Sequence, residues 1–147
     1  MDARVQNQLR NVLRLPIKWR YGAIASGVAL TQVTGFMWYS PGSAWSRQLP
    51  PTTFSQSSTE MTINLITQTA VDTGFAFLLH YLSSRYFRPA TMQDALVFAG
   101  LISAAQLIPQ IPQVLWGRKP LGLFFVDQAF IALGIFVKIL CIQNIPY

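Results

Sequence analysis

Four long apolar segments, free or nearly free of charged residues, dominate this 147-residue sequence. No Asp, Glu, Lys or Arg occurs between Tyr21 and Ser46, or between Ala95 and Trp116. A helix of about 20 apolar residues crosses the ~30 Å hydrocarbon layer of a bilayer. Charged residues make up only 11% of the chain, too few to cover the surface of a small soluble domain. The sequence therefore predicts an all-α, integral membrane four-helix bundle.

The expected organisation is one membrane domain over residues 21–143, preceded by a basic arm at 1–20 and followed by a short tail at 144–147. The four spans are expected at residues 21–39, 61–82, 95–116 and 121–143. Capping boxes at Ser57–Glu60 and Thr91–Asp94 predict the starts of the second and third helices.

The arm at residues 1–20 has the apolar spacing of a short amphipathic helix. It carries five basic residues, which are Arg4, Arg10, Arg14, Lys18 and Arg20. Such an arm suits binding to anionic phospholipid, cardiolipin included, or to a partner protein. Nucleic acid is rejected as a partner because the basic residues of the chain lie at the ends of apolar segments, where a lipid interface would place them.

Four spans place both chain ends on one side of the membrane. With Arg85 and Arg88, that side holds seven basic residues, against three on the other side, which are Arg47, Arg118 and Lys119. The positive-inside rule then puts both ends in the cytoplasm or the mitochondrial matrix. We expect the matrix side of the mitochondrial inner membrane, because the arm also resembles an organelle-import segment.

Asp72 is the ionisable residue expected nearest the midplane, where burying a charge is costly and often functional. Counting ~1.5 Å per residue places Thr31 and Gln32 at a similar depth. One interpretation makes Asp72 a proton or cation site, with His80 continuing a relay inward. The other makes these residues interhelical polar contacts.

Two further ionisable residues lie within the fourth span. Asp127 is expected near the outer edge, level with Gln110 of the third span and close to Tyr39 and Arg118. Lys138 is expected near the inner edge, where it would extend to the interface or pair with Asp94. Small residues at Gly27, Thr31 and Gly35 follow one row of the first span and favour close helix approach.

Enzyme chemistry and cofactor binding are not expected. The chain has one histidine and one cysteine, Cys141, which leaves no ligand set typical of zinc or haem. No phosphate-binding glycine loop and no nucleophile elbow occurs.

The segment that ends the first span, Trp38–Tyr39–Ser40–Pro41 followed by Trp45, resembles the signature of a small membrane family called DUF1761, a domain of unknown function. Leu123–Phe124–Phe125–Val126–Asp127 after a basic turn is also similar to that family. The resemblance implies four membrane helices and no particular reaction. Some proteins of this size and type, chiefly fungal, are accessory subunits of respiratory complex I.

The expected function is that of a non-catalytic accessory subunit. Its partners would be the membrane subunits of a larger inner-membrane assembly, with mitochondrial complex I as the leading candidate. The alternative is a small proton- or cation-coupled transporter or channel centred on Asp72.

Overall fold

The computed structural model describes residues 17–49, 57–116 and 120–145. Every regular element in these ranges is helical, which confirms the expected all-α class. The elements in chain order are α2 (Tyr21–Trp38), η1 (Ser46–Gln48), α3 (Ser58–Leu82), the π-helical turn η3 (Ser83–Phe87), α4 (Met92–Leu107), η4 (Ile108–Gln110), α5 (Ile111–Leu115) and α6 (Leu121–Asn144). The predictions for Arg4, Arg10, Arg14 and Arg118 lie outside the described residues.

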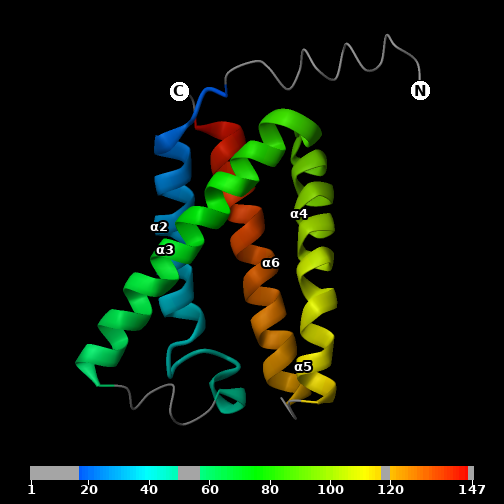
Figure 1. Cartoon of the computed structure of the whole chain (residues 1–147). Coiled ribbons are helices and arrows are strands. Elements are labelled where there is room, and N and C mark those ends of the chain that lie inside the picture. The colour runs from blue at the N-terminus through cyan, green and yellow to red at the C-terminus, as the bar shows by residue number, and fades with distance from the viewer. Residues whose placement is uncertain (1–16, 50–56, 117–119, 146–147) are drawn as a thin grey trace.

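The helices run alternately up and down, so the molecule has two distinct ends (Figure 1). We call the upper part the terminus half; it contains the start of α2, the end of α3, the start of α4 and the end of α6. The loop half contains the opposite ends of these helices. Arg20 Nη1 donates to the carbonyl oxygen of Ile142 at 2.7 Å, which ties the start of α2 to the end of α6.

Both expected capping boxes are present. The carboxylate of Glu60 accepts from the Ser57 amide at 2.9 Å, and that of Asp94 accepts from the Thr91 amide at 2.9 Å. Each serine or threonine side chain accepts from the amide of its acidic partner in return. These contacts satisfy amide groups that the first turn of a helix leaves without intrahelical acceptors.

The turn between α3 and α4 ends in a left-handed residue. Arg88 has φ 41°, and its amide donates to the Ser83 carbonyl at 2.8 Å, five residues earlier. Pro89, which follows, cannot continue the helical hydrogen bonds. The chain therefore reverses and α4 runs back toward the loop half.

α6 is the central helix, with α2 and α4 against it. The main apolar core joins the end of α3, the start of α4 and the end of α6, and its buried members include Leu79, Phe98, Ile135 and Ile139. A smaller cluster joins Ile24 and Val28 of α2 to Ala76 of α3. Both clusters lie in the terminus half.

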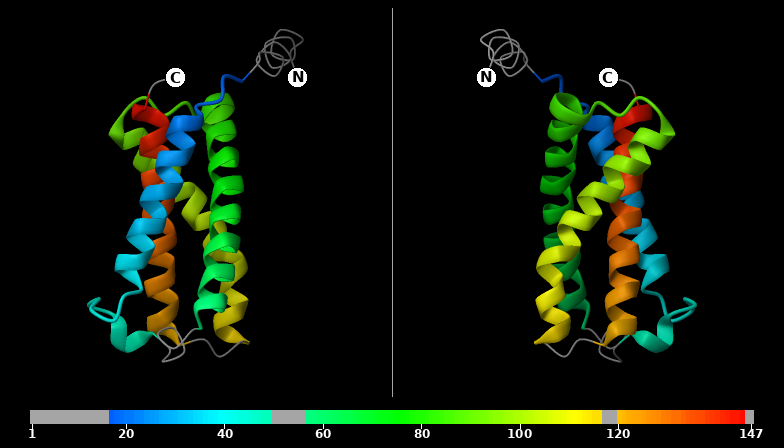
Figure 2. Two further views of the ribbon diagram at one scale, coloured as in Figure 1. Left: turned by 90° about the vertical axis from the view of Figure 1, so that its left-hand side faces the viewer. Right: turned by 90° about the vertical axis from the view of Figure 1, so that its right-hand side faces the viewer.

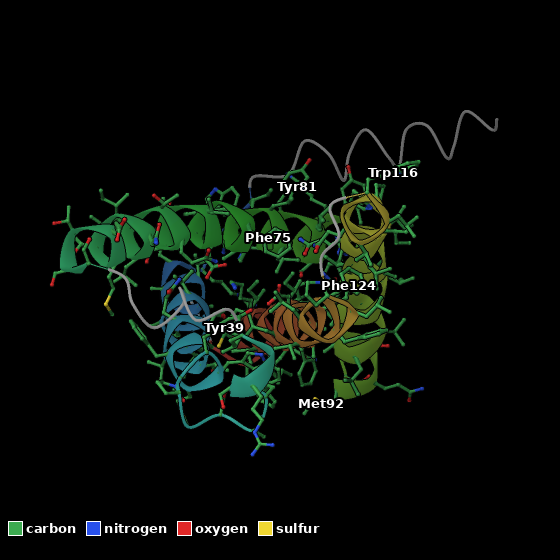
Figure 3. The ribbon with its side chains drawn as sticks, turned by 90° about the horizontal axis from the view of Figure 1, so that it is seen from below. Tyr39, Phe75, Tyr81, Met92, Trp116 and Phe124 are labelled. Atoms are coloured by element: carbon green, nitrogen blue, oxygen red, sulfur yellow. The ribbon has the colours of Figure 1, made fainter. Side chains whose placement is uncertain are left out.

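α3 leaves the bundle in the loop half. Every residue from 58 to 68 is exposed. The first half of α3 diverges from α6 in the view of Figure 1, whereas the two helices run nearly parallel in the side views of Figure 2. Viewed from below, α3 extends well beyond the other helices (Figure 3).

Two helical stretches of the described chain, Met92–Gln110 and Leu121–Asn144, are long and apolar enough to cross a bilayer. They favour a membrane association. That four helices span the membrane stays a prediction. That both ends of the chain lie on its matrix side also stays a prediction. The third predicted span is interrupted at η4, because Pro109 lacks the amide hydrogen that an uninterrupted α-helix uses.

Candidate functional site

A buried ion pair joins three helices near the middle of the bundle. Lys138 of α6 is 3% exposed, and its Nζ lies 3.3 Å from Oδ1 of Asp72 on α3. The same Nζ donates to Oγ1 of Thr31 on α2 at 3.1 Å. Gln32 donates to the other carboxylate oxygen of Asp72 at 2.9 Å. The lysine charge is therefore met by one carboxylate, and each carboxylate oxygen has a donor.

Small residues let α2 and α6 approach closely at this level. A Cβ added to Gly27 would lie 3.2 Å from the Cα of Lys138, and one added to Gly134 would lie 3.1 Å from the Thr31 methyl group. A side chain at either glycine would displace the helix backbone or the threonine. The close approach places the lysine stem between the two helices, which accounts for its burial.

The structure corrects the expected partner of Lys138. We expected it to extend to the near interface or to pair with Asp94, but Asp94 caps α4 instead. A Cα–Cβ bond tilts toward the start of its own helix, and α6 starts in the loop half. The lysine side chain is consequently directed toward the middle of the bundle and reaches Asp72.

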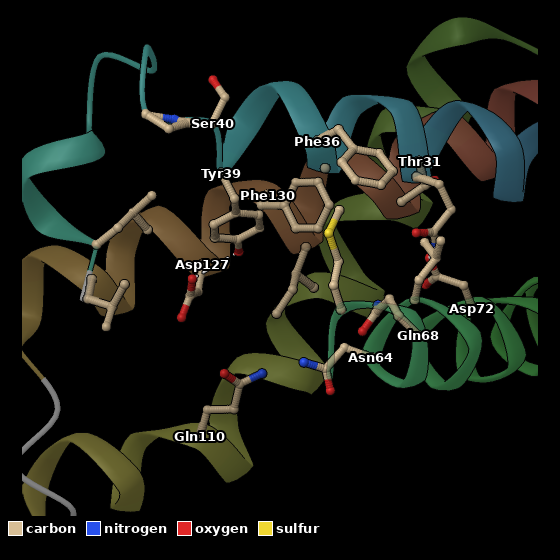
Figure 4. A pocket seen from close by; sticks show the side chains of 18 residues that line it. Thr31, Phe36, Tyr39, Ser40, Asn64, Gln68, Asp72, Gln110, Asp127 and Phe130 are labelled. Carbon is tan, nitrogen blue, oxygen red and sulfur yellow. Dashed lines mark hydrogen bonds between the residues drawn. The ribbon is translucent and has the colours of Figure 1, made fainter. Parts of the chain in front are cut away.

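A cavity of about 1010 Å³ opens beside Asp72 and continues into the loop half. It exists because α3 diverges there from α2 and α6. Three polar side chains of α3 line it at intervals of four residues, which are Asn64, Gln68 and Asp72 (Figure 4). Asn64 and Gln68 were not among the predicted site residues, although their four-residue spacing with Asp72 was the signal that could have identified them.

The far end of the cavity is built around Asp127 of α6. The Tyr39 hydroxyl donates to Asp127 Oδ1 at 2.9 Å, and the Tyr39 ring meets the Phe130 ring edge to face, with centroids 5.2 Å apart. Gln110 also lines the cavity and accepts a hydrogen bond from Gln128. Asp127, Tyr39 and Gln110, which the sequence placed at one depth, are thus brought to one cavity.

His80 belongs to a different cluster. It is 1% exposed, and its Nε2 accepts from the Arg20 amide at 3.3 Å. Its Nδ1 lies 3.4 Å from the Ser84 hydroxyl, and the Trp19 ring packs against it with centroids 5.3 Å apart. These contacts join the end of α3 to the start of α2, and no hydrogen bond of the described residues links His80 to Asp72. The proposed relay between the two therefore has no direct structural connection.

The Trp-Tyr-x-Pro segment shapes the end of α2. The Trp45 indole donates to the Trp38 carbonyl at 2.6 Å, and the two rings lie 3.9 Å apart. Pro41 and Tyr39 line the cavity. The four signature residues thus fold the chain back at the end of α2 and place the Tyr39 hydroxyl on Asp127.

A family model for a protein of unknown function, DUF1761, matches residues 22–142. The chain belongs to this family.

Neither a curated protein nor a solved structure matches the chain. The family description assigns no activity. Within residues 17–49, 57–116 and 120–145, no three His, Cys, Asp or Glu side chains gather as metal ligands would. The candidate site is therefore a cavity of mixed apolar and polar lining, with the Asp72–Lys138 ion pair at one end.

Proposed function

We propose that the chain is a non-catalytic accessory subunit of a larger inner-membrane assembly, with mitochondrial respiratory complex I as the leading candidate. The observation that carries this proposal is the divergence of α3. Its first half exposes apolar side chains, including Ile63 and Ile66, the latter 64% exposed. The same stretch carries Asn64 and Gln68.

A partner helix suits this stretch better than lipid alone. Lipid tails offer no hydrogen-bonding groups, whereas the polar side chains of a neighbouring membrane helix do. The mixture of carboxamides and apolar groups on α3 therefore supports a protein neighbour. The basic residues of the expected arm at 1–20 support an additional contact with anionic phospholipid.

The decisive experiment is native separation of the tagged chain from its own membranes in a mild detergent, followed by mass spectrometry. Migration with a respiratory complex at fixed stoichiometry is expected. Shortening Ile63 and Ile66 together to alanine should reduce that association. The matched control shortens Leu96 and Leu101, two exposed leucines of α4, to alanine. This control should leave the association with the complex unchanged. Migration alone or as a homo-oligomer would contradict the proposal.

A second candidate function is proton- or cation-coupled transport, which is favoured by the cavity reaching Asp72. The single variant Asp72→Asn would leave the Lys138 charge unpaired, so the paired variant Asp72→Asn/Lys138→Met is the cleaner test. Transport predicts that purified chain in liposomes carries a proton or cation flux, which the folded paired variant loses. A flux equal to that of empty liposomes would exclude this function.

A further inference from the structure

The cavity has an apolar wall to which three helices contribute. Phe36 of α2, Leu65 of α3 and Ile131 of α6 all belong to its lining. Phe36 is 53% exposed and Leu65 is 39% exposed, so this wall reaches the surface of the chain. The volume of about 1010 Å³ lies at the upper end of the range of roughly 300–1,000 Å³ that sites for small organic molecules occupy. A ligand of this cavity therefore needs an apolar body of some size.

The polar groups at the Asp72 end of the cavity have balanced charges. One carboxylate oxygen of Asp72 lies 3.3 Å from Nζ of Lys138, and the other accepts from Gln32 at 2.9 Å. A charged ligand at this end would lose its hydration without meeting an uncompensated opposite charge. A neutral polar group loses less hydration and can be satisfied by hydrogen bonds alone.

Gln68 can supply such hydrogen bonds. It lies on α3 one turn before Asp72, lines the cavity, and stands beside Asp72 in the close view (Figure 4). Among the residues that the structure describes, no hydrogen bond engages its carboxamide. A carboxamide both donates and accepts, so it can pair with a carbonyl, a hydroxyl or an amide group.

We propose that this cavity binds a neutral, lipid-soluble molecule whose polar group is a carbonyl, a hydroxyl or an amide. The polar group lies at Gln68, and the apolar body lies along Phe36, Leu65 and Ile131. The molecule can be a neutral lipid of the bilayer or a free lipophilic compound. Hydrogen bonding at Gln68 selects the polar group, and the apolar wall provides the larger contact area.

The test measures calorimetrically the binding of 4-butylbenzamide to the purified chain in phosphatidylcholine nanodiscs, with empty nanodiscs as the blank. Three comparison probes keep the butylphenyl body and change its end, which are butylbenzene without a polar group, the cation 4-butylbenzylammonium and the anion 4-butylbenzoate. Dissociation constants are referred to the probe concentration in the bilayer, which the empty nanodiscs give. The amide is expected to bind at least fivefold more tightly than butylbenzene and tenfold more tightly than either ion. No binding of the amide above the blank, or equal binding of any comparison probe, would overturn the proposal.

Variants locate the site. Gln68→Leu should weaken binding of the amide at least fivefold and leave butylbenzene within twofold, because it removes hydrogen-bonding groups and keeps apolar bulk. Phe36→Ala should weaken both probes at least threefold. Gln68 and Phe36 are exposed, so neither variant removes a core side chain. Thr67→Val is the matched control, because Thr67 is a neighbouring exposed residue that does not line the cavity; its effect should stay within twofold. Unchanged binding of the amide in Gln68→Leu or in Phe36→Ala would contradict the site.

The site can be separated from the association with a partner proposed above. Ile63 and Ile66, at which that association is tested, do not line the cavity. Shortening both to alanine should therefore keep binding of the amide within twofold, even where it reduces the association. Loss of amide binding in this variant would contradict a site inside the cavity.

The source of the ligand follows from adding dioleoylglycerol, a neutral lipid with a hydroxyl group, to the nanodiscs. If the natural ligand is a neutral lipid, dioleoylglycerol should weaken binding of the amide probe, because the two compete for the cavity. A dissociation constant that does not change identifies a free lipophilic compound. Either result supports a site for a neutral ligand and names where the ligand comes from.

Discussion

The terminus half and the loop half of the bundle use polar residues in opposite ways. In the terminus half and at its lower boundary, polar groups bind one another and are buried, as Lys138, Asp72 and Thr31 show. In the loop half, Asp127, Gln110 and Asn64 border an open cavity. The difference arises from α3, which contacts the core through Leu79 and Ala76 but is exposed from residue 58 to 68.

This contrast separates residues that stabilise the fold from those available to a ligand or a partner. A buried ion pair holds its two side chains to each other, whereas the exposed groups of the loop half can meet another molecule. The terminus half is therefore expected to respond to mutation mainly through stability, and the loop half mainly through binding.

The largest expected effect comes from breaking the ion pair. Lys138→Met should destabilise the fold by about 3 kcal/mol, because Asp72 would be left buried without its cation. The paired variant Asp72→Asn/Lys138→Met should recover most of that loss. A double-mutant cycle of unfolding in detergent measures the coupling. Additive losses would show that the pair does not act as one unit.

A smaller loss should follow from separating α2 and α6. Gly27→Leu should cost about 2 kcal/mol, because a Cβ added at Gly27 would lie only 3.2 Å from the Cα of Lys138 and the rest of the leucine has no space. Gly100→Leu is the matched control, since a Cβ added to Gly100 meets nothing within 4 Å. Thermal unfolding of both variants gives the comparison. Equal losses would contradict the close α2–α6 contact as the cause.

In the loop half, Tyr39→Phe should cost only about 1 kcal/mol, because it removes one hydrogen bond to Asp127 at a site that water or a ligand can reach. Hydrogen–deuterium exchange should increase near the end of α2 and the start of α6 while the core around Ile139 stays protected. Increased exchange throughout the bundle would show that the two halves unfold together.

The smallest expected effect concerns the exposed start of α3. Hydrogen bonds from the Ser57 backbone amide and then its side chain lower the pKa of Glu60 below its ordinary value. Since folding lowers this pKa, the cap is fully formed at neutral pH and is lost as the pH falls through the lowered pKa. The NMR shift of the Ser57 amide should follow that titration. Glu60→Gln, which keeps a capping residue, should abolish the pH dependence without unfolding α3.

Much of the fold was predictable because it depends on local rules. The capping boxes at Ser57 and Thr91 place the starts of α3 and α4, and the apolar segments coincide with the long helices. The row of Gly27, Thr31 and Gly35 does face α6, where Lys138 and Phe130 approach the two glycines. Depth counting and the structure agree that Asp72 is level with Thr31 and Gln32.

The polar partners were less predictable. Counting residues along a span estimates the depth of each Cα but ignores the direction of the side chain. It therefore assigned Lys138 to the inner interface and did not identify Asp72 as its partner. It also placed His80 on a path from Asp72, whereas the helix geometry turns His80 toward Trp19 and Arg20. The cavity itself had no sequence signal beyond the spacing of Asn64, Gln68 and Asp72.

The sequence by itself determined the all-helical class, the helix starts and the family, because periodicity, capping and the Trp-Tyr-x-Pro segment are properties of neighbouring residues. Only the tertiary structure decided that α3 diverges, that Lys138 pairs with Asp72, and that Asp127 borders a cavity. These features depend on the angle between α3 and α6 and on the direction in which α6 runs. Such quantities arise from the packing of residues far apart in the chain.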